Sequence, residues 1–195
     1  MTATSDSCSN AADDIMRLTR RLEKLKQCFA LCGIINSTLD LSEVLDRIMN
    51  TSRRAVGAET CSLLLVDETP GPGRGELVFQ VAQGPMSDGL RQGFRLKRGE
   101  GLAGWACEHG RPLLIEDAYA DARFNPEVDR RTGYRTRTIL TVPLAVRGRV
   151  IGVSQLINKE DGTAFDAADL ETFTLICDQA AVAIDNARLH AEMLK

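Results

Sequence analysis

The sequence predicts an α+β domain with a central antiparallel sheet of about six strands, helices on one face of it, and long N- and C-terminal helices that form a bundle. Two observations carry this prediction. Short apolar runs occur in two neighbouring pairs, 61–66 with 77–82 and 139–146 with 150–158, each pair joined by a turn that contains glycine. Helical periodicity dominates both ends of the chain, so strands and helices are segregated.

The N-terminal part divides into a polar stretch, 1–12, which we expect to be disordered, and a helix over 13–40. Apolar and small residues recur there at alternating spacings of three and four, as in a heptad seam. They are Ile15, Leu18, Leu22, Leu25, Phe29, Cys32, Asn36 and Leu39. Such a seam can pack on the sheet or on a second copy of itself, and Asn36 would suit a register-setting role in a dimer.

A second helix is predicted over 41–57, with an apolar stripe that includes Leu45 and Ile48 and a stop at Gly57. The first strand pair follows, and its turn is rich in Pro and Gly. Residues 83–93 carry glycine and proline breaks and indicate a loop. A short strand at 94–96, a helix opened by a glycine-rich turn at 99–106 and a short strand at 113–115 come next.

The stretch 116–159 begins as a polar, Arg-rich excursion and ends as the second strand pair, typical of a sheet with a lid. Asn125-Pro126-Glu127 predicts a helix start, with Asn125 as N-cap and Pro126 at the first helical position. This helix can last only to about Gly133. Asp166 is expected to cap a final helix that runs nearly to Lys195. Its heptad positions are Phe173, Cys177, Ala180, Ile184, Ala187, Ala191 and Leu194.

Composition excludes several classes of protein. A net charge of −3 argues against a general nucleic-acid surface. The N-terminus lacks the pattern of a signal peptide, and no apolar run approaches the roughly 20 residues that span a bilayer. We therefore expect a cytoplasmic protein, without membrane contact, whose six cysteines are reduced. Cys28 and Cys32 share a helix face as half of a possible metal site, although two buried small side chains explain them better. We predict no metal site.

Three motifs resemble those of GAF domains, the sensing modules of cyclic-nucleotide phosphodiesterases, adenylyl cyclases and sensor kinases. They are GEGLAGWA at 99–106, DARFNPEVDRRTGYRTRTIL at 121–140, and the set Asn158, Lys159, Phe165 and Asp169, with Leu170 where the family has Glu. The resemblance covers roughly 41–194, and it implies a GAF domain over 41–195 behind a signalling helix at 13–40. A salt bridge from Lys159 to Asp169 would hold the final helix on the sheet.

The resemblance also implies a set of ligand contacts for a cyclic nucleotide, cAMP or cGMP. Carried over by position, they are Ser62, Ala82, Gln83, Leu102, Ala103, Asn125, Asp129, Thr132, Thr136 and Gln155. Four of them depart from the family in residue type. Ala82 lacks the aromatic ring of the family, Gln83 and Gln155 are neutral in place of acids, and Asn125 also differs. The frame of a nucleotide pocket is thus predicted, with unusual base-reading residues and no certain cofactor.

The residues themselves also allow a phosphate site. The helix opened at Gly101 offers free N–H groups and a favourable dipole. Four arginines would raise the local potential, although a solvated loop face explains them somewhat better. They are Arg130, Arg131, Arg135 and Arg137. Trp105 is expected in the core. His109 and His190 have no partner at a catalytic spacing.

These observations favour a non-catalytic sensor that binds a small ligand, most simply a cyclic nucleotide, and transmits the bound state through its terminal helices. We expect a parallel homodimer and a possible separate effector protein. The alternative is a ligand-free dimerisation module with a vestigial pocket. A small redox enzyme that uses Cys61 or Cys107 is a third class, and catalytic motifs of other kinds are absent from the sequence.

Overall fold

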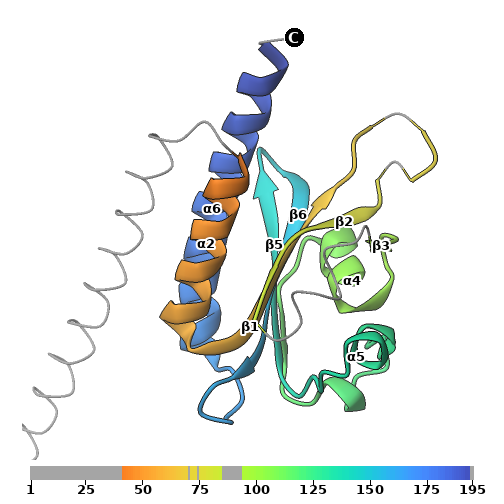
Figure 1. Cartoon of the computed structure of the whole chain (residues 1–195), viewed down its shortest axis with the longest axis vertical. Coiled ribbons are helices and arrows are strands. Elements are labelled where there is room, and N and C mark those ends of the chain that lie inside the picture. The colour runs from red at the N-terminus through yellow and green to blue at the C-terminus, as the bar shows by residue number, and fades with distance from the viewer. Residues whose placement is uncertain (1–40, 70, 74, 85–93, 194–195) are drawn as a thin grey trace, which may run out of the picture.

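The computed structural model describes residues 41–69, 71–73, 75–84 and 94–193. Figure 1 shows one curved sheet between two layers of helices. In chain order the elements are α2 (Leu41–Val56), β1 (Ala58–Val66), β2 (Leu77–Gln83), β3 (Arg95–Leu96), α4 (Gly101–His109), β4 (Leu113–Ile115), the 3-10 helix η1 (Ala118–Ala120), α5 (Glu127–Thr132), β5 (Ile139–Val146), β6 (Arg149–Lys159) and α6 (Ala167–Met193). The predicted elements over this range are all present.

The sheet has six strands in the order β3-β2-β1-β6-β5-β4, and all neighbours are antiparallel. Both predicted hairpins, β1–β2 and β5–β6, are confirmed. The β5–β6 turn is tight because Arg147 and Gly148 both have positive φ angles, 51° and 78°. Two such residues suit the right-handed twist of a hairpin. β1 and β6 lie at the centre of the sheet.

One face of the sheet is covered by α2 and α6, which lie side by side in Figure 1. Their apolar side chains form the larger core with the inward residues of β1, β5 and β6. The heptad positions Phe173, Cys177, Ala180 and Ile184 are all buried in this core. The prediction that this seam packs against a second copy was therefore wrong for these four residues, because their own sheet and α2 already cover them.

Different apolar residues remain exposed on α6. Leu175, Val182 and Leu189 are 44%, 51% and 40% exposed, and they recur every seven residues. Since seven residues make close to two helical turns, the three side chains form a stripe on one side of the helix. The apolar residues that α6 exposes to solvent are therefore those of this stripe, and not those of the buried seam.

The opposite face of the sheet carries α4 and α5, so helices lie on both faces. The sequence prediction placed helices on one face and treated this segment as an inserted helix and lid. α4 packs through Leu102, Ala106 and Cys107 on a second apolar cluster that includes Leu64 and Val153. The short α5 stands off from the sheet, and the space beneath it is the pocket described below.

The junction between β6 and α6 is held as predicted. Asp166 accepts hydrogen bonds from the backbone N–H groups of Ala168 and Asp169, at 2.8 and 2.9 Å, and so caps the helix. Lys159 Nζ lies 2.9 Å from Asp169 Oδ2, with both side chains mostly buried. The salt bridge inferred from the sequence is therefore present, and it fixes the first turn of α6 to the end of β6.

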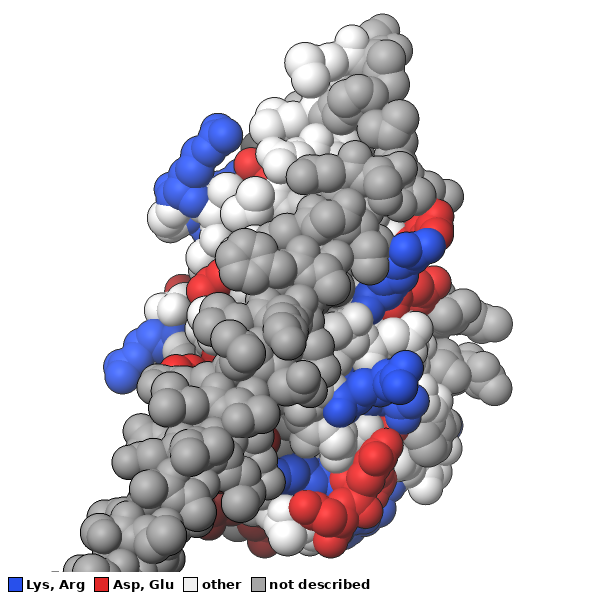
Figure 2. All heavy atoms as spheres, turned by 90° about the vertical axis from the view of Figure 1, so that its left-hand side faces the viewer, with Lys and Arg blue, Asp and Glu red and all other residues white. Residues whose placement is uncertain are grey.

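Figure 2 views the molecule from the side of α2 and α6, where blue and red side chains of the described surface are interspersed. The predicted helix over 13–40 and the polar stretch 1–12 lie outside the described residues, so the domain boundaries proposed for them stay predictions. Within the part of the chain that the structure describes, no helix is both long and apolar enough to cross a bilayer.

Candidate functional site

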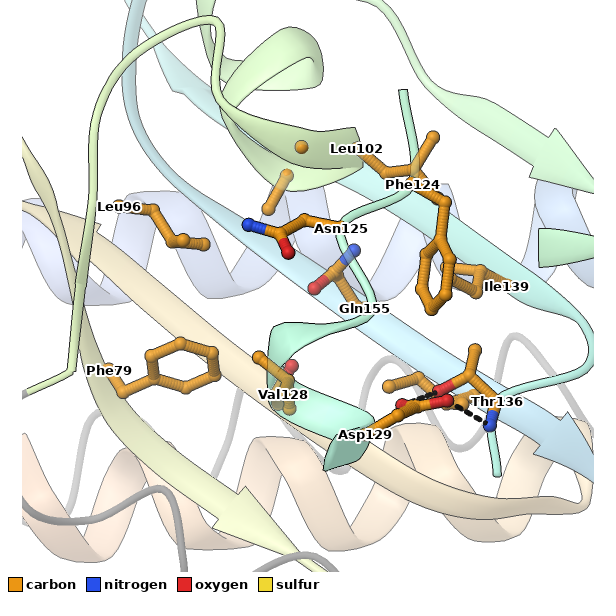
Figure 3. A pocket seen from close by; sticks show the side chains of 14 residues that line it. Phe79, Leu96, Leu102, Phe124, Asn125, Val128, Asp129, Thr136, Ile139 and Gln155 are labelled. Atoms are coloured by element: carbon orange, nitrogen blue, oxygen red, sulfur yellow. Dashed lines mark hydrogen bonds between the residues drawn. The ribbon is translucent and has the colours of Figure 1, made fainter. Parts of the chain in front are cut away.

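A pocket lies between the sheet and the segment that carries α5, which we call the lid (residues 121–138). It is enclosed by the floor strands β1, β2, β5 and β6, by the first turn of α4 and by the lid (Figure 3). Its volume is about 70 Å³. The lining residues are Ser62, Phe79, Leu96, Gly101, Leu102, Ala103, Phe124, Asn125, Val128, Asp129, Thr136, Ile139, Gln155 and Ile157.

The structure brings seven of the ten predicted contact residues to this pocket. They are Ser62, Leu102, Ala103, Asn125, Asp129, Thr136 and Gln155. They come from four separate parts of the chain, which only the tertiary fold places together. Their contact with a ligand remains a prediction.

The other three predicted residues do not line the pocket. Gln83 pairs with Cys61, whose side chain faces the helical core, and its amide reaches Asp46 of α2 on that same face. Thr132 donates its hydroxyl hydrogen to the Val128 carbonyl within α5. Ala82 is buried in a small apolar cluster with Ile157. Gln83 follows Ala82 on β2 and so points to the opposite face of the sheet, because adjacent strand residues alternate in direction.

Two of the lining residues, Ser62 and Gln155, belong to a row of cross-strand neighbours that crosses four strands of the sheet. Ala82, Ser62, Gln155 and Thr141 are successive cross-strand partners on β2, β1, β6 and β5. Gln155 Nε2 donates to Thr141 Oγ1 at 3.0 Å. The Ser62 hydroxyl is buried and has no hydrogen-bond partner in the structure. A buried hydroxyl without a partner is unfavourable, so a ligand that bonded it would be stabilised.

The lid is closed by a buried carboxylate. Asp129 is only 5% exposed, and it accepts hydrogen bonds from Thr136 N at 2.8 Å and Thr136 Oγ1 at 2.6 Å (Figure 3). Tyr119 donates a third bond from its hydroxyl at 3.0 Å. Burial, followed by this bond to a carboxylate, raises the pKa of Tyr119. These bonds tie α5 to the chain just before β5.

The start of α5 differs by one residue from the prediction. The helix begins at Glu127, with Pro126 and not Asn125 in the N-cap position. Asn125 instead accepts a hydrogen bond from Glu127 N on its side-chain oxygen, at 3.0 Å. This bond uses only Oδ1, and Asn125 lines the pocket, where its Nδ2 group can donate to a ligand. The helix ends at Gly133, as predicted.

The first turn of α4 offers backbone donors to the pocket. Gly104 N makes the bond to Glu100 O, so the three amides before it have no acceptor within the helix. Glu100 gives no side-chain cap. The lid roofs this turn, since a Cβ on Gly101 would lie 3.9 Å from Asn125 Cβ. Such a turn favours an anionic group.

Gly104 itself has a packing role. A Cβ at this position would lie 2.5 Å from Lys97 O, a distance that real Cβ atoms essentially never show. The glycine-rich motif therefore has two roles: it lets the chain at Lys97 pass close to α4, and it leaves the first turn of the helix open to the pocket.

None of the five lid arginines lines the pocket, the four singled out in the sequence included. Arg137 pairs with Glu59 at 2.6 Å, and Arg130 lies 3.5 Å from Glu127. The guanidinium of Arg131 lies over the Phe94 ring and that of Arg135 over the Tyr119 ring. The solvated-face interpretation of these residues agrees with this arrangement. Among the lining residues, Asp129 is the one with a charged side chain.

The end of the lid is anchored by Asn158, at the end of β6. Its Oδ1 accepts hydrogen bonds from the N–H groups of Arg137 and Thr138, at 2.7 and 3.1 Å. Its Nδ2 lies within hydrogen-bond distance of Tyr134 Oη, Arg135 O and Glu59 Oε2. Asn158 adopts a φ of 53°, which asparagine tolerates better than most residues.

Titration behaviour follows from this cluster. Burial raises the pKa of Glu59, but its hydrogen bonds with Tyr134, Arg137 and Asn158 outweigh burial and lower that pKa overall. Burial and the bond to Glu59 raise the pKa of Tyr134 to about 12. The cluster is therefore a carboxylate with neutral and cationic donors around it at neutral pH.

Cysteine and histidine chemistry finds little support in the described residues. Cys61, Cys107 and Cys177 are free and buried, and none lines the pocket. Burial raises the pKa of each thiol, that of Cys61 to about 12, so the reactive thiolate form is disfavoured. His109 stacks on Trp105. No cluster of three potential metal ligands occurs in the described ranges, and Cys28 and Cys32 lie outside them.

Six apolar pocket residues were not foreseen from the sequence. They supply much of the lining, and they are Phe79, Leu96, Phe124, Val128, Ile139 and Ile157. Phe124 belongs to the lid motif, so its position in the sequence could have predicted that it lines the pocket. Phe79 lies three residues before Ala82 on β2 and supplies an aromatic ring on the strand where the missing ring was noted. The irregular register of β1 with β2 between Leu63 and Leu64 makes such a position hard to assign.

This fold and this pocket define a class of protein. The family model of the GAF domain matches residues 40–184. The chain therefore belongs to the GAF domain family, whose members are regulatory modules that sense small molecules and are generally not catalytic.

Particular relatives sharpen the comparison. A Caenorhabditis elegans protein described as probable 3',5'-cyclic phosphodiesterase pde-5 is 35% identical over 164 residues. Those residues are 81% of this chain but 22% of that relative, so the chain spans less than a quarter of the relative's length.

Solved structures support the fold. The GAF domain of a phosphoenolpyruvate-protein phosphotransferase from Coxiella burnetii matches with a TM-score of 0.75 and 22% identity, over 88% of this chain and 98% of that one. A free methionine-R-sulfoxide reductase from Neisseria meningitidis, solved with its substrate, matches with a TM-score of 0.69 and 21% identity, over 86% and 91%. At these identities the likeness concerns the fold alone.

Proposed function

We propose that this GAF domain is a non-catalytic sensor that binds a cyclic nucleotide between the sheet and the lid and passes the bound state to its terminal helices. The single observation that carries the proposal is the composition of the pocket. Open backbone donors of α4 stand at one end, and a buried, unpartnered Ser62 hydroxyl stands on the floor. The rings of Phe79 and Phe124 and several aliphatic side chains make up most of the remaining lining.

This arrangement suits a ligand with an anionic end and a flat, largely apolar body with polar edges. A cyclic phosphodiester carries a single negative charge, which the free amides and dipole of one helix terminus can stabilise. No cationic side chain lines the pocket, and the Asp129 carboxylate does. A ligand with several negative charges would therefore be poorly compensated here. The likeness to a probable cyclic phosphodiesterase supports the same ligand class.

We propose that binding moves the lid. A volume of about 70 Å³ holds a few water molecules, at about 10–15 Å³ each by the same measure of space. A cyclic nucleotide is larger than a few water molecules. The lid is tied at Asp129 and at Asn158, and the ligand would have to displace α5 between these two points. Because Asn158 is next to Lys159, which holds α6, we propose that this displacement reaches α6 through the end of β6.

We further propose a homodimer in which the exposed α6 stripe, Leu175, Val182 and Leu189, meets the terminal helices of a second copy. An effector as a separate protein remains part of this proposal. The stripe replaces the buried seam as the dimerising surface, since the seam residues are used within the domain.

A second candidate function is a ligand-free dimerisation module. The small pocket volume and the absence of lining cations favour it. A third, a redox enzyme, has the fold of the sulfoxide reductase in its favour, but the three described cysteines are buried outside the pocket with raised pKa values.

Calorimetric titration of the 195-residue chain with cyclic AMP and cyclic GMP tests the proposal. Trp105 is the only tryptophan, and Arg123 of the lid lies 4.7 Å from its ring, so its fluorescence reports lid movement. We expect binding heat together with a fluorescence change. Ser62→Ala, which removes the unpartnered hydroxyl, should weaken binding, whereas Thr69→Ala in the exposed β1–β2 turn should not. No heat at millimolar ligand would favour the ligand-free module.

A further inference from the structure

Three arginines of the lid lie on aromatic rings that belong to segments outside it. Each guanidinium carbon is within about 6 Å of the centre of its ring, the range of a cation–π interaction. The pairs are Arg123 with Trp105 at 4.7 Å, Arg131 with Phe94 at 5.1 Å and Arg135 with Tyr119 at 3.6 Å. The lid is therefore held to its surroundings by charges on rings as well as by hydrogen bonds.

Two of these contacts lie near the ends of the lid, and other bonds accompany them. Arg123 also pairs with Asp121 at 2.6 Å, and Tyr119 also donates a hydrogen bond to Asp129. The contact of Arg131 with Phe94 has a different position. Arg131 belongs to α5, and Phe94 directly precedes β3, which forms one edge of the sheet. Since the lid leads into β5, near the other edge, this contact reaches across to the far side of the pocket.

Phe94 is part of the fixed wall of the pocket. Its ring packs on that of Phe79, with the ring centroids 5.8 Å apart and an interplanar angle of 60°. Phe79 N donates to Phe94 O at 3.5 Å, and the Phe79 side chain lines the pocket. Arg131 therefore rests on a ring that β2 holds in place.

The helix α5 needs such contacts to stay in place. It has six residues, fewer than two turns, and a helix of this length is not stable by itself. One side of it is bonded through Asp129, as described above. Val128 and Arg131 are three residues apart and so lie on a common side. Val128 lies beside the Phe79 ring in Figure 3, and both pack against the same small apolar cluster. Arg131, which is exposed, is the outer contact on that side.

We propose that Arg131 and Phe94 form a latch that sets how often the lid opens when no ligand is bound. The contact joins α5 to the wall, so it must break when α5 is displaced. This role in binding rests on the proposed function, in which the ligand binds with α5 displaced. A latch that favours the closed lid then lowers the apparent affinity, because it reduces the fraction of chains that can bind. Removing the latch should both open the lid and tighten binding, whereas loss of a merely structural contact would weaken binding.

Hydrogen exchange of the lid amides, measured by mass spectrometry on the ligand-free 195-residue chain, reports lid opening. A cation–π contact at an exposed site contributes about 0.5–1 kcal/mol, which converts to about twofold to fivefold in the opening equilibrium. We expect Arg131→Gln to speed exchange by this factor and Phe94→Leu to speed it at least as much. The double variant should exchange more slowly than the product of the two single effects predicts, because both changes remove the same contact.

The matched control is Arg130→Gln, the same change at the neighbouring exposed position of α5. Arg130 lies 3.5 Å from Glu127 of its own helix, so this variant should leave exchange unchanged. Both changes remove one positive charge, so they alter the long-range attraction of an anion about equally. Any difference between them therefore reports the contact with the ring.

Calorimetric titration of the same variants with cyclic AMP and cyclic GMP gives the second readout. Arg131→Gln should tighten binding about twofold to fivefold, and Arg130→Gln should not. Unchanged exchange or weaker binding in Arg131→Gln would overturn the latch, and the sensor function would stand as long as a nucleotide binds. Faster exchange in Arg131→Gln, with neither nucleotide bound by any variant, would support the latch and overturn the proposed function.

Discussion

Asn158→Ala is the substitution that best tests how the lid is anchored. The asparagine side chain accepts hydrogen bonds from two backbone N–H groups and lies against three further polar groups. Alanine supplies none of these bonds. Each buried polar group left without a partner costs about 1–3 kcal/mol, so the Thr138 amide and the other freed groups together cost about 3 kcal/mol.

A second contribution comes from the backbone. The φ of 53° places Asn158 in the left-handed region of backbone conformation. This conformation costs alanine about 1 kcal/mol more than it costs asparagine. We therefore expect a total loss of about 4 kcal/mol in the free energy of unfolding. Losses of this size are rare for single substitutions and belong to broken buried networks of this kind.

Equilibrium urea unfolding, followed by Trp105 fluorescence and by far-UV circular dichroism, measures this loss. The matched control is Asn186→Ala on the exposed side of α6, which should leave stability unchanged or slightly higher because alanine favours a helix. A loss below about 1 kcal/mol for Asn158→Ala, with an unchanged urea slope, would refute the reasoning, since buried orphaned groups cost at least that much.

Three further predictions concern a charge, a surface and a glycine. Glu59→Gln should lower stability near neutral pH. Since the folded pKa of Glu59 is lowered, this difference should begin to shrink as the pH falls below the ordinary 4.5 and vanish only below the folded pKa, as seen in urea midpoints measured against pH. Light scattering should give about twice 21.3 kDa for the chain, and Val182→Asp should give folded monomers, whereas unmutated monomers would contradict the dimer. Gly104→Ala should lower the thermal midpoint, at a cost of about 1–3 kcal/mol, because its Cβ meets Lys97 O; an unchanged midpoint would show that the loop yields freely.

Much of the fold followed from local patterns. Strand bounds such as Leu113–Ile115 and Ile139–Val146 agree with the structure to the residue. Alternation, turn glycines and capping residues act over a few positions, so they can be interpreted without knowing the partner of each element. The Lys159–Asp169 salt bridge was also accessible, because both residues lie close along the chain at the junction of two elements.

The surface that the heptad residues of α6 contact could not be predicted in this way. Its heptad pattern predicts an apolar stripe, but the same stripe serves a bundle or a sheet equally well. The structure assigns Phe173 and Ile184 to the core of the domain and leaves Val182 outside. The choice depends on which surface α2 and the sheet leave uncovered, and that is a property of the assembled molecule.

The pocket shows the same division. The sequence by itself determined that a lid with Asp129 and Thr136 follows a glycine-rich helix start, because these motifs are continuous stretches of chain. Only the tertiary structure decided that Ser62, Gln155 and Thr141 form one row, and that Gln83 faces the opposite side of the sheet. The physical reason is that strand register sets which side chains meet, and a shift of one residue exchanges the two faces.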